Sequence, residues 1–515
     1  WGIPSNLDLT NHFRFTLPFY DAIVAGDLYP GWLAESTGGY GDPSFRFYPP
    51  ALYYLLAAAR FVIGNWYGAT LVVFAALSIV SALGMYFWTR SFFTPTTATW
   101  ASIFYALAPY HVNQLYQAVL LAEWAGSAVL PFVFGFVERV CERGKARDIA
   151  GLAATYALLI LTHLPLAVIG SIALLVYALV KTRQPAKLAK LAAGAIVGVS
   201  LSAIYWVTMV SEVSWIGLND VKQSASVDYR FNFIFSTFSP DNLSVWWMNV
   251  LVLMTLLLCA PAVLLVFRNA ASLRRVVLPA FALTGFALFM SVPLSRPIWW
   301  LFKPLQETQF PWRWMVLISM GASILAAAGL PLIPESVRKL DRAKRMALFA
   351  AMAVSIVFTL SHVVREAQYF PPQQFNNMLT EVRGTSSLTY WFPVWSRSNP
   401  RKMTTEVEVP GREVTLMSWQ PEHRKFSVTA GSATEARVRT FFYPHWRAKH
   451  ESGVLTTRPD QDGALLISLP ENATAVELDF QEPRRTQFST IASLSGLIIT
   501  GVLAVPLRGR RKKHD

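Results

Sequence analysis

The sequence predicts a helical protein that crosses a membrane many times and carries one small β-rich domain near its C-terminus. Of its 515 residues, 53% are hydrophobic and only 15% are charged, whereas ordinary soluble domains contain about 25% charged residues. The mean hydropathy of +0.37 is also too high for a soluble globule of this length. The composition therefore indicates an integral membrane protein.

Apolar runs of about 17–25 residues are long enough to span a bilayer as helices. Such runs cover residues 68–90, 97–113, 118–138, 189–210, 244–267, 275–293, 311–332, 345–364 and 486–507. The longer run 148–181 contains His163-Leu164-Pro165 and predicts two helices joined by a tight hairpin. The short run 49–63 predicts an interfacial helix. We expect about a dozen helices, counting a first one before Trp1.

The distribution of positive charge predicts the orientation. The net charge is +14, but the basic residues form short clusters between apolar runs, as in cytoplasmic loops of membrane proteins. These clusters lie at 139–147, 181–190, 268–275, 338–345 and 508–513. The predicted spans place all five on one side, so we expect a cytoplasmic C-terminus and no nucleic-acid partner.

The segment 366–485 differs from the rest of the chain. Alternating stretches such as Glu406-Val407-Glu408-Val409 are separated by proline and glycine turns, which is typical of β-strands. We therefore expect a small extracytoplasmic β-sandwich. The predicted divisions are a first extracytoplasmic loop with interfacial helices (1–67), a transmembrane bundle (68–365), the β-domain (366–485), and a last helix with a basic tail (486–515).

The first loop contains the strongest candidates for chemistry. In a helix that begins near residue 6, Asp8 and His12 share one face. A carboxylate there can accept a proton from an acceptor group, with the imidazole orienting it or sharing the proton. The alternative is a solvated helix start, where Asp8 faces the positive end of the helix dipole. Asp8 and Asp42 can also both ligate one divalent cation, although no spacing requires a metal.

Three residues of the predicted spans have a functional and a structural interpretation. Arg313, at the outer end of a helix, can hold a phosphate bidentately, or it can anchor that end at the lipid headgroups. Glu123 must face a cavity or a cation, because an unpaired charge facing lipid is costly. It lines a site or forms a structural ion pair. His163 binds a ligand or simply completes its hairpin. Likewise, the tryptophans Trp391, Trp395, Trp419 and Trp446 stack on sugars or pack in the β-domain.

Several motifs resemble the GT-C superfamily of membrane glycosyltransferases. They are Asp8 and His12, then Gly26/Pro30/Trp32, Tyr40-Gly41-Asp42-Pro43 with Phe47-Tyr48-Pro49-Pro50-Ala51-Leu52-Tyr53, Ala122-Glu123, His163, Gln309-Phe310-Pro311-Trp312-Arg313, and Phe442-Tyr443-Pro444-His445-Trp446. The order of these motifs is most similar to a bacterial multipass branch labelled 6-pyruvoyl-tetrahydropterin-synthase-related membrane proteins. The label is historical, and nothing in the sequence indicates pterin chemistry.

The resemblance implies a GT-C-like fold in the bacterial cytoplasmic (inner) membrane. It implies transfer of a sugar from a polyprenyl-phosphate carrier to an acceptor at the extracytoplasmic face. Asp8 and His12 would be catalytic, and Glu123, His163, Gln309, Arg313 and Asp42 would bind substrate. Membrane lipids and other subunits of a membrane complex would be its further partners. No cofactor is required by the motifs, and the divalent cation stays open.

One departure from the motifs favours a second interpretation. Where the family has an Arg-Gly pair before the conserved acid, this chain has Ala118-Val119. An inactive GT-C-fold subunit that scaffolds a larger complex is therefore the alternative. For an enzyme, we expect Asp8 and Arg313 to line one outward-facing cavity, because the base and the phosphate-binding cation must act together. We also expect Tyr443 and Trp446 in the β-domain core or against the first loop.

Overall fold

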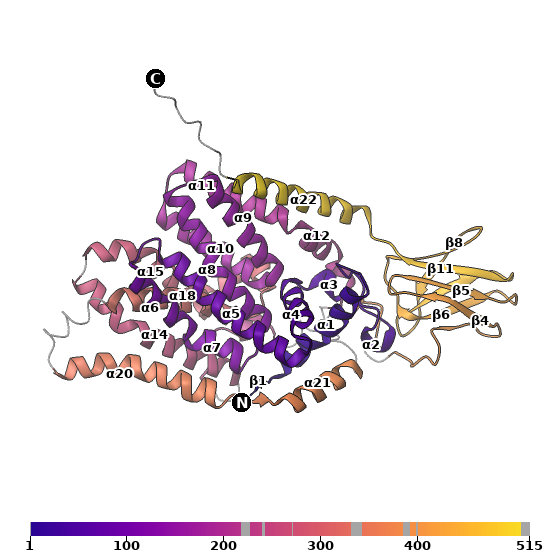
Figure 1. The fold of residues 1–515 in the computed structure, drawn as a ribbon, viewed down its shortest axis with the longest axis horizontal. Coiled ribbons are helices and arrows are strands. Elements are labelled where there is room, and N and C mark those ends of the chain that lie inside the picture. The colour runs from indigo at the N-terminus through magenta and orange to yellow at the C-terminus, as the bar shows by residue number, and fades with distance from the viewer. Residues whose placement is uncertain are drawn as a thin grey trace, which may run out of the picture.

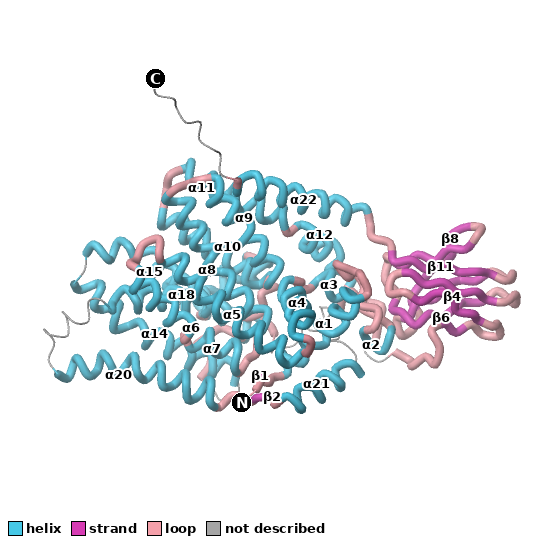
Figure 2. The backbone as a smooth tube through the Cα atoms, viewed as in Figure 1, coloured by secondary structure: helices cyan, strands magenta, loops and turns pink. Residues whose placement is uncertain are grey.

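A computed structural model shows a large helical body with a β-domain at one end (Figure 1). It describes residues 2–217, 227–238, 243–269, 271–330, 342–384, 392–397 and 400–505. Helices make up the body, and most of the strands gather in the β-domain (Figure 2). The last helix runs along the body and leads back from the β-domain to the C-terminal end (Figure 1).

The helices of the body differ widely in length. They are α1 (Leu7–Val24), α2 (Ser36–Gly39), α3 (Ser44–Phe47), α4 (Ala51–Ile63), α5 (Trp66–Thr89), α6 (Pro95–Ala106), α7 (Pro109–Tyr116), α8 (Leu121–Glu142), α9 (Ala146–Thr162), α10 (Leu164–Lys181), α11 (Pro185–Leu201), α12 (Ala203–Glu212), α14 (Leu243–Asn269), α15 (Ala271–Ser291), α16 (Arg296–Leu301), α17 (Lys303–Gln306), α18 (Met315–Gly329), α20 (Arg342–Phe358), α21 (Pro372–Gly384) and α22 (Arg484–Ala504).

Six of the described helices are long and apolar enough to cross a membrane, or up to eight if each of two bent pairs counts as one span. The expected multipass helical protein is therefore confirmed. The number is lower than the dozen expected because some apolar runs are divided. Run 97–113 breaks before Pro109 into α6 and α7, and α11 and α12 meet at a bend of 70°.

Burial differs strongly between the spans. In the span that contains α18, all residues of the apolar window are buried among neighbouring helices. In the span formed by α22, only 11% of the window is buried. Helix α22 packs along α9, α11 and α12 at the edge of the body. An exposed apolar surface of this kind is stable in lipid but not in water, which agrees with a membrane environment.

The β-domain is a sandwich of two antiparallel sheets, as predicted. Its strands are β3 (Val407–Glu408), β4 (Val414–Trp419), β5 (His423–Val428), β6 (Thr434–Phe441), β7 (Trp446–His450), β8 (Gly453–Leu455), β9 (Thr457–Pro459), β10 (Ala464–Leu469) and β11 (Thr474–Phe480). One sheet has the order β3-β6-β10-β9 and the other β4-β5-β11-β7-β8. Inward-facing Phe426, Val438, Ile467 and Val476 from both sheets form one core.

The start of segment 366–485 is not β-rich. A short strand, β2 (Tyr369–Phe370), pairs with β1 (Ile3–Pro4) near the N-terminus, and α21 follows it. Helix α21 packs on α1, where the rings of Phe13 and Phe375 lie 5.2 Å apart. Apolar contacts with α1 therefore stabilise a helix where the sequence analysis expects strands. The strands of the sandwich begin only at Val407.

The part of the first loop between α1 and α4, residues 25–50, inserts a tryptophan into the end of the sandwich. Trp32 is 1% exposed, and its ring lies 5.7 Å from that of Trp446 and 5.8 Å from that of Tyr443. Tyr443 and Trp446 are themselves fully buried, which confirms the expected contact with the first loop. Gly41 has a φ of 73°, and a Cβ there would lie 2.3 Å from the Trp32 indole nitrogen, so this position requires glycine.

The orientation can be tested by cysteine labelling. The native Cys141 and Cys259 are buried, so they give little background. Ser452 is exposed in the β-domain and Ala146 is exposed at the start of α9. We expect Ser452→Cys to react with an impermeant maleimide in intact cells, and Ala146→Cys to react only after lysis. The reverse pattern would place the β-domain in the cytoplasm.

Candidate functional site

Asp8 and His12 form a pair in the first turns of α1. His12 Nε2 lies 3.4 Å from Asp8 Oδ2, and His12 Nδ1 lies 2.9 Å from the hydroxyl of Tyr53 on α4. The imidazole is 4% exposed, whereas the Asp8 side chain is 37% exposed. The buried histidine is therefore held from both sides, and Asp8 is the member of the pair that solvent or a ligand can reach.

Arg313 and Glu123 form a second, buried pair. Arg313 lies in the 3-10 turn Pro311–Trp314, and its Nε is 2.8 Å from Glu123 Oε2 in the first turn of α8. Glu123 also accepts hydrogen bonds from the Tyr110 hydroxyl (2.6 Å) and the Gln114 amide (2.9 Å). Arg313 donates a further bond to the Thr308 carbonyl. The ion-pair interpretation of Glu123 is thus the one that the structure shows.

The turn before Glu123 is strained. Val119 has a φ of 50°, a left-handed conformation that is rare for β-branched residues, and its side chain is fully buried. The motif that this segment resembles has glycine here, which adopts such a φ without cost. The arginine of the motif is absent too, and Arg313 supplies a guanidinium to Glu123 from a distant part of the chain.

Tyr48 lies within electrostatic range of both pairs. Burial raises the pKa of its hydroxyl, the Asp8 carboxylate raises it further, and Arg313 lowers it. The Tyr48 ring also lies 6.2 Å from the His12 ring. Sequence reasoning treated Tyr48 and Tyr53 only as parts of a motif. Their place on either side of Pro49-Pro50 in that motif was the available signal.

The other predicted residues have local structural contacts. The His163 Nδ1 accepts a hydrogen bond from the Leu166 amide (3.2 Å) and caps α10, in agreement with the hairpin interpretation. Arg313 and His12 are among its electrostatic neighbours. Asp42 is completely buried and accepts a hydrogen bond from the Ser44 amide (2.9 Å) at the start of α3. Gln309 is half-buried in the turn before Arg313, with a φ of 65°.

A half-open, mainly apolar cavity of about 230 Å³ lies beside the buried pair. Its walls include Leu107 and Leu360, which are partly exposed at the surface of the body, and His111 and Trp124. A polar chain leads inward from His111. It passes through Ser127 (3.3 Å) to Gln114 (3.4 Å), which donates to Glu123. The cavity is thus connected to the Arg313–Glu123 pair.

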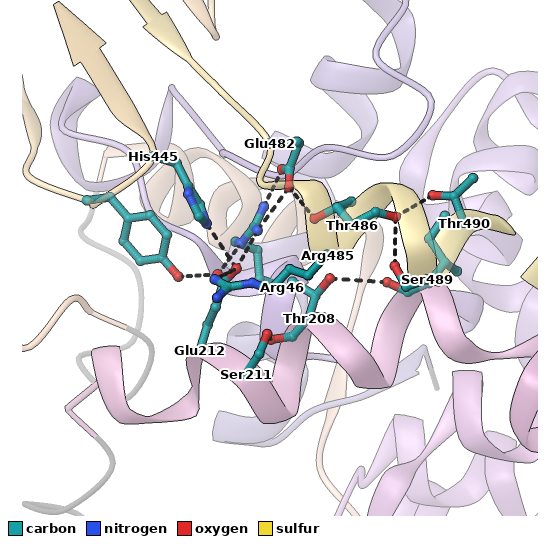
Figure 3. Close-up of polar contacts among 12 residues, drawn as sticks. Arg46, Thr208, Ser211, Glu212, His445, Glu482, Arg485, Thr486, Ser489 and Thr490 are labelled. Carbon is teal, nitrogen blue, oxygen red and sulfur yellow. Dashed lines mark hydrogen bonds and ion pairs between the residues drawn. The ribbon is translucent and has the colours of Figure 1, made fainter. Parts of the chain in front are cut away.

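A second polar cluster joins the β-domain to the body (Figure 3). At its centre is Glu212, the last residue of α12, which is fully buried. It accepts hydrogen bonds from Arg46 of the first loop (2.6 and 2.7 Å) and from Arg485 of α22 (2.7 Å). The Tyr443 hydroxyl (2.6 Å) and His445 Nε2 (2.9 Å) reach it from the β-domain. We call these residues, with Glu482, the joint.

Arg46 of the joint also pairs with Glu482, directly before α22. Two further carboxylates, Asp27 and Glu422, lie within electrostatic range of Glu482. Burial, followed by the charges of Asp27 and Glu482, raises the pKa of the Glu422 carboxyl to about 7, although Arg46 opposes this. The first loop and the β4–β5 turn thus bring more acidic groups together than the basic groups neutralise.

The described residues contain one group that resembles a metal site: His423, Glu477 and Asp479 on β5 and β11. His423 Nδ1 lies 2.5 Å from Asp479 Oδ1. Lys449 contacts both carboxylates, at 3.2 and 3.1 Å. An ammonium group already neutralises these acids, so the contacts account for the cluster as a surface ion-pair network.

Taken together, these features define a multipass membrane protein with a β-domain clamped to its first loop and last helix. The model of the 6-pyruvoyl-tetrahydropterin synthase related domain, described as a membrane protein, matches residues 45–369. The chain belongs to this family, which confirms the resemblance seen in the sequence. None of the curated proteins matches it.

Two solved structures show some similarity. The arabinofuranosyltransferase AftD from Mycobacteria matches with a TM-score of 0.47 and 16% identity, over 73% of this chain. The match covers 26% of AftD, so this chain spans only about a quarter of that enzyme. ArnT from Cupriavidus metallidurans bound to undecaprenyl phosphate matches with a TM-score of 0.42 and 14% identity, over 74% of this chain and 70% of ArnT. Both TM-scores are below 0.5.

The acidic group at Glu422 predicts a pH-dependent stability. A carboxyl with a raised pKa binds more protons in the folded than in the unfolded protein, so stability falls as pH rises from about 4.5 to about 7. Glu422→Gln removes this loss. At pH 8 its midpoint of thermal unfolding in nanodiscs should lie a few degrees above that of the unchanged protein.

At pH 4 the variant and the unchanged protein should have the same midpoint, because both side chains are then neutral. The matched control is Glu413→Gln, at an exposed position of the same domain, which should change neither value. A Glu422→Gln effect of equal size at both pH values would show that packing, and not charge, causes it.

Proposed function

We propose that the protein transfers a sugar from a polyprenyl-phosphate carrier to an acceptor at the extracytoplasmic face of the membrane. The observation that carries the proposal is the combination of two pairs around Tyr48. Asp8 is the reachable acid of one pair, and Arg313 is the buried cation of the other. Both groups act on the same hydroxyl, so they belong to one electrostatic environment.

The chemistry follows from these two groups. The acceptor hydroxyl attacks the anomeric carbon of the donor sugar, and Asp8 takes the proton of that hydroxyl. The bond between the anomeric carbon and the phosphate oxygen breaks, and polyprenyl phosphate leaves with the electron pair. A guanidinium stabilises the negative charge on this leaving group, most strongly where water is excluded. His12 holds Asp8 in position.

The apolar cavity supports the choice of a lipid carrier. It is partly open at Leu107 and Leu360, and a chain of hydrogen bonds leads from His111 in its wall through Ser127 and Gln114 to Glu123. A lipid tail can occupy an apolar cavity while its phosphate remains near Arg313.

The second candidate function is a non-catalytic subunit. One observation favours it: Arg313 is bonded to Glu123 and Thr308, so binding a phosphate requires it to share or exchange these partners. A purely structural role for this pair would leave Asp8 without a partner cation for catalysis.

The variant Asp8→Asn tests the proposal directly. An amide cannot accept the acceptor's proton, so transfer from radiolabelled polyprenyl-phosphate pentoses and hexoses in proteoliposomes should fall at least about 100-fold. Binding of polyprenyl phosphate alone should persist. The control is Asp21→Asn on the same helix, whose carboxylate pairs with Arg383 at the surface (2.7 Å) and should not affect transfer. Unchanged transfer by Asp8→Asn would rule out this base.

A paired substitution separates the two roles of Arg313. Arg313→Gln alone leaves the buried Glu123 unpaired, which should cost about 3–5 kcal/mol in stability. The double variant Arg313→Gln, Glu123→Gln removes both charges and should recover most of this loss. If Arg313 binds phosphate, the double variant will bind polyprenyl phosphate at least about tenfold more weakly. Unchanged binding by a stable double variant would favour the subunit function.

A further inference from the structure

The β-domain and the first loop enclose a small polar cavity away from the site described above. Its volume is about 90 Å³, and it is open on one side. Ala34, Glu35 and Gly39 of the first loop form one wall. Trp419, Gln420 and Pro421, at the β4–β5 turn, and Arg439 of β6 form the other. Three segments that are remote in sequence thus meet around it.

An unusual cation contacts Trp419, one of the residues that line this cavity. Arg424 is 1% exposed, and its guanidinium lies between two indoles, 4.4 Å from the Trp419 ring and 4.9 Å from the Trp446 ring. Its Nη1 donates to the Arg439 carbonyl (3.3 Å), whereas its buried Nε has no hydrogen-bond partner among the described residues. A buried guanidinium with so few acceptors is costly for the fold.

Arg439 is a second cation, and it has an N–H group that makes no hydrogen bond to the described residues. Its Nη2 pairs with Glu406 at 2.8 Å, but its buried Nε also has no partner among the described residues. The Arg439 side chain lines the cavity and lies so close to Gly39 that a Cβ there would be 3.2 Å from Nε. Burial lowers the pKa of Arg424 to about 9, with Arg439 contributing and Glu35 opposing, so Arg424 remains charged near neutral pH.

The remaining walls distinguish between kinds of ligand. Arg439 favours an anionic group, since a carboxylate or phosphate can accept several N–H bonds, and the nearby charge of Arg424 adds to the positive potential. Glu35 disfavours a bare anion but can accept hydrogen bonds from hydroxyl groups. Gln420 can both donate and accept, and Trp419 offers an aromatic surface to C–H groups. Together these groups match a polyhydroxylated ring that carries one negative charge.

We propose that this cavity binds a sugar unit bearing a carboxylate or a phosphate. The charged group lies towards Arg439, and the hydroxyls lie towards Glu35 and Gln420. The cavity of about 90 Å³ is small and open on one side, so one ring enters partly and the remainder of a glycan extends through the open side. The binding does not depend on sugar transfer, and it takes place on the β-domain side of the joint.

Binding of defined sugars to the full chain in lipid nanodiscs tests the inference. Isothermal titration uses methyl glucuronide and glucose 6-phosphate as anionic sugars, methyl glucoside as the uncharged sugar, and inorganic phosphate as the anion without a sugar. We expect at least one anionic sugar to bind at least tenfold more tightly than both of the other probes. Comparison of the two anionic sugars shows which acid the site prefers.

Variants locate the binding. Arg439→Gln should weaken the preferred anionic sugar at least tenfold, and Gln420→Ala, at an exposed turn position that the fold does not need, should weaken it severalfold. The control is Arg458→Gln on β9, whose arginine pairs with Glu435 at the surface and should not matter. Equal binding of methyl glucoside and the anionic sugars, tight binding of phosphate alone, or full binding by both cavity variants would overturn the proposal. No donor lipid is present, so the result is independent of Asp8.

Discussion

The buried carboxylate of Glu212 is the contact on which the arrangement of the molecule depends. It is completely inaccessible to solvent and accepts hydrogen bonds from the first loop, the β-domain and the last helix. A buried charge is costly unless it is fully paired, and removing one partner of such a pair is more destabilising than the pair itself is stabilising. The parts of the joint must therefore assemble together, because the absence of any one part leaves a buried charge of the other parts without its partner.

This arrangement makes the β-domain part of the framework of the catalytic candidates. The same loop that supplies Arg46 to the joint and Trp32 to the sandwich core connects α1, with Asp8 and His12, to α4, with Tyr53. A displacement of the β-domain would move this loop and, through it, Tyr48. The sandwich thus stabilises the loop on which the catalytic candidates depend. This role is separate from the ligand binding proposed for the β-domain.

The features that sequence reasoning predicted well are those with local causes. The Asp8–His12 pair follows from helical periodicity, the hairpin at His163 from Pro165, and the sandwich from alternating strands. Helix α21 was missed because its stability comes from packing on α1, a contact between residues more than 350 positions apart.

The ion pairs were harder to predict for the same reason. The need for a cation near Glu123 could be inferred from its place in a span, but the identity of that cation could not, because Arg313 is 190 residues away. Arg46 and Glu212 were not recognised as partners at all. Each has an unremarkable local sequence, and only the three-dimensional fold brings them within 2.6 Å.

The joint also has a consequence for how the chain is made. Arg46 is synthesised well before Glu482 and Arg485, because 436 positions separate it from Glu482. Until α22 has been made, Glu212 lacks its partner Arg485, so the joint is incomplete although Arg46, Tyr443 and His445 already bond this carboxylate. Contacts between such distant residues form slowly, and the waiting segments expose apolar surface. The joint therefore closes only after the last helix has been made, and a chain that loses α22 keeps most of its spans but leaves Glu212 without Arg485.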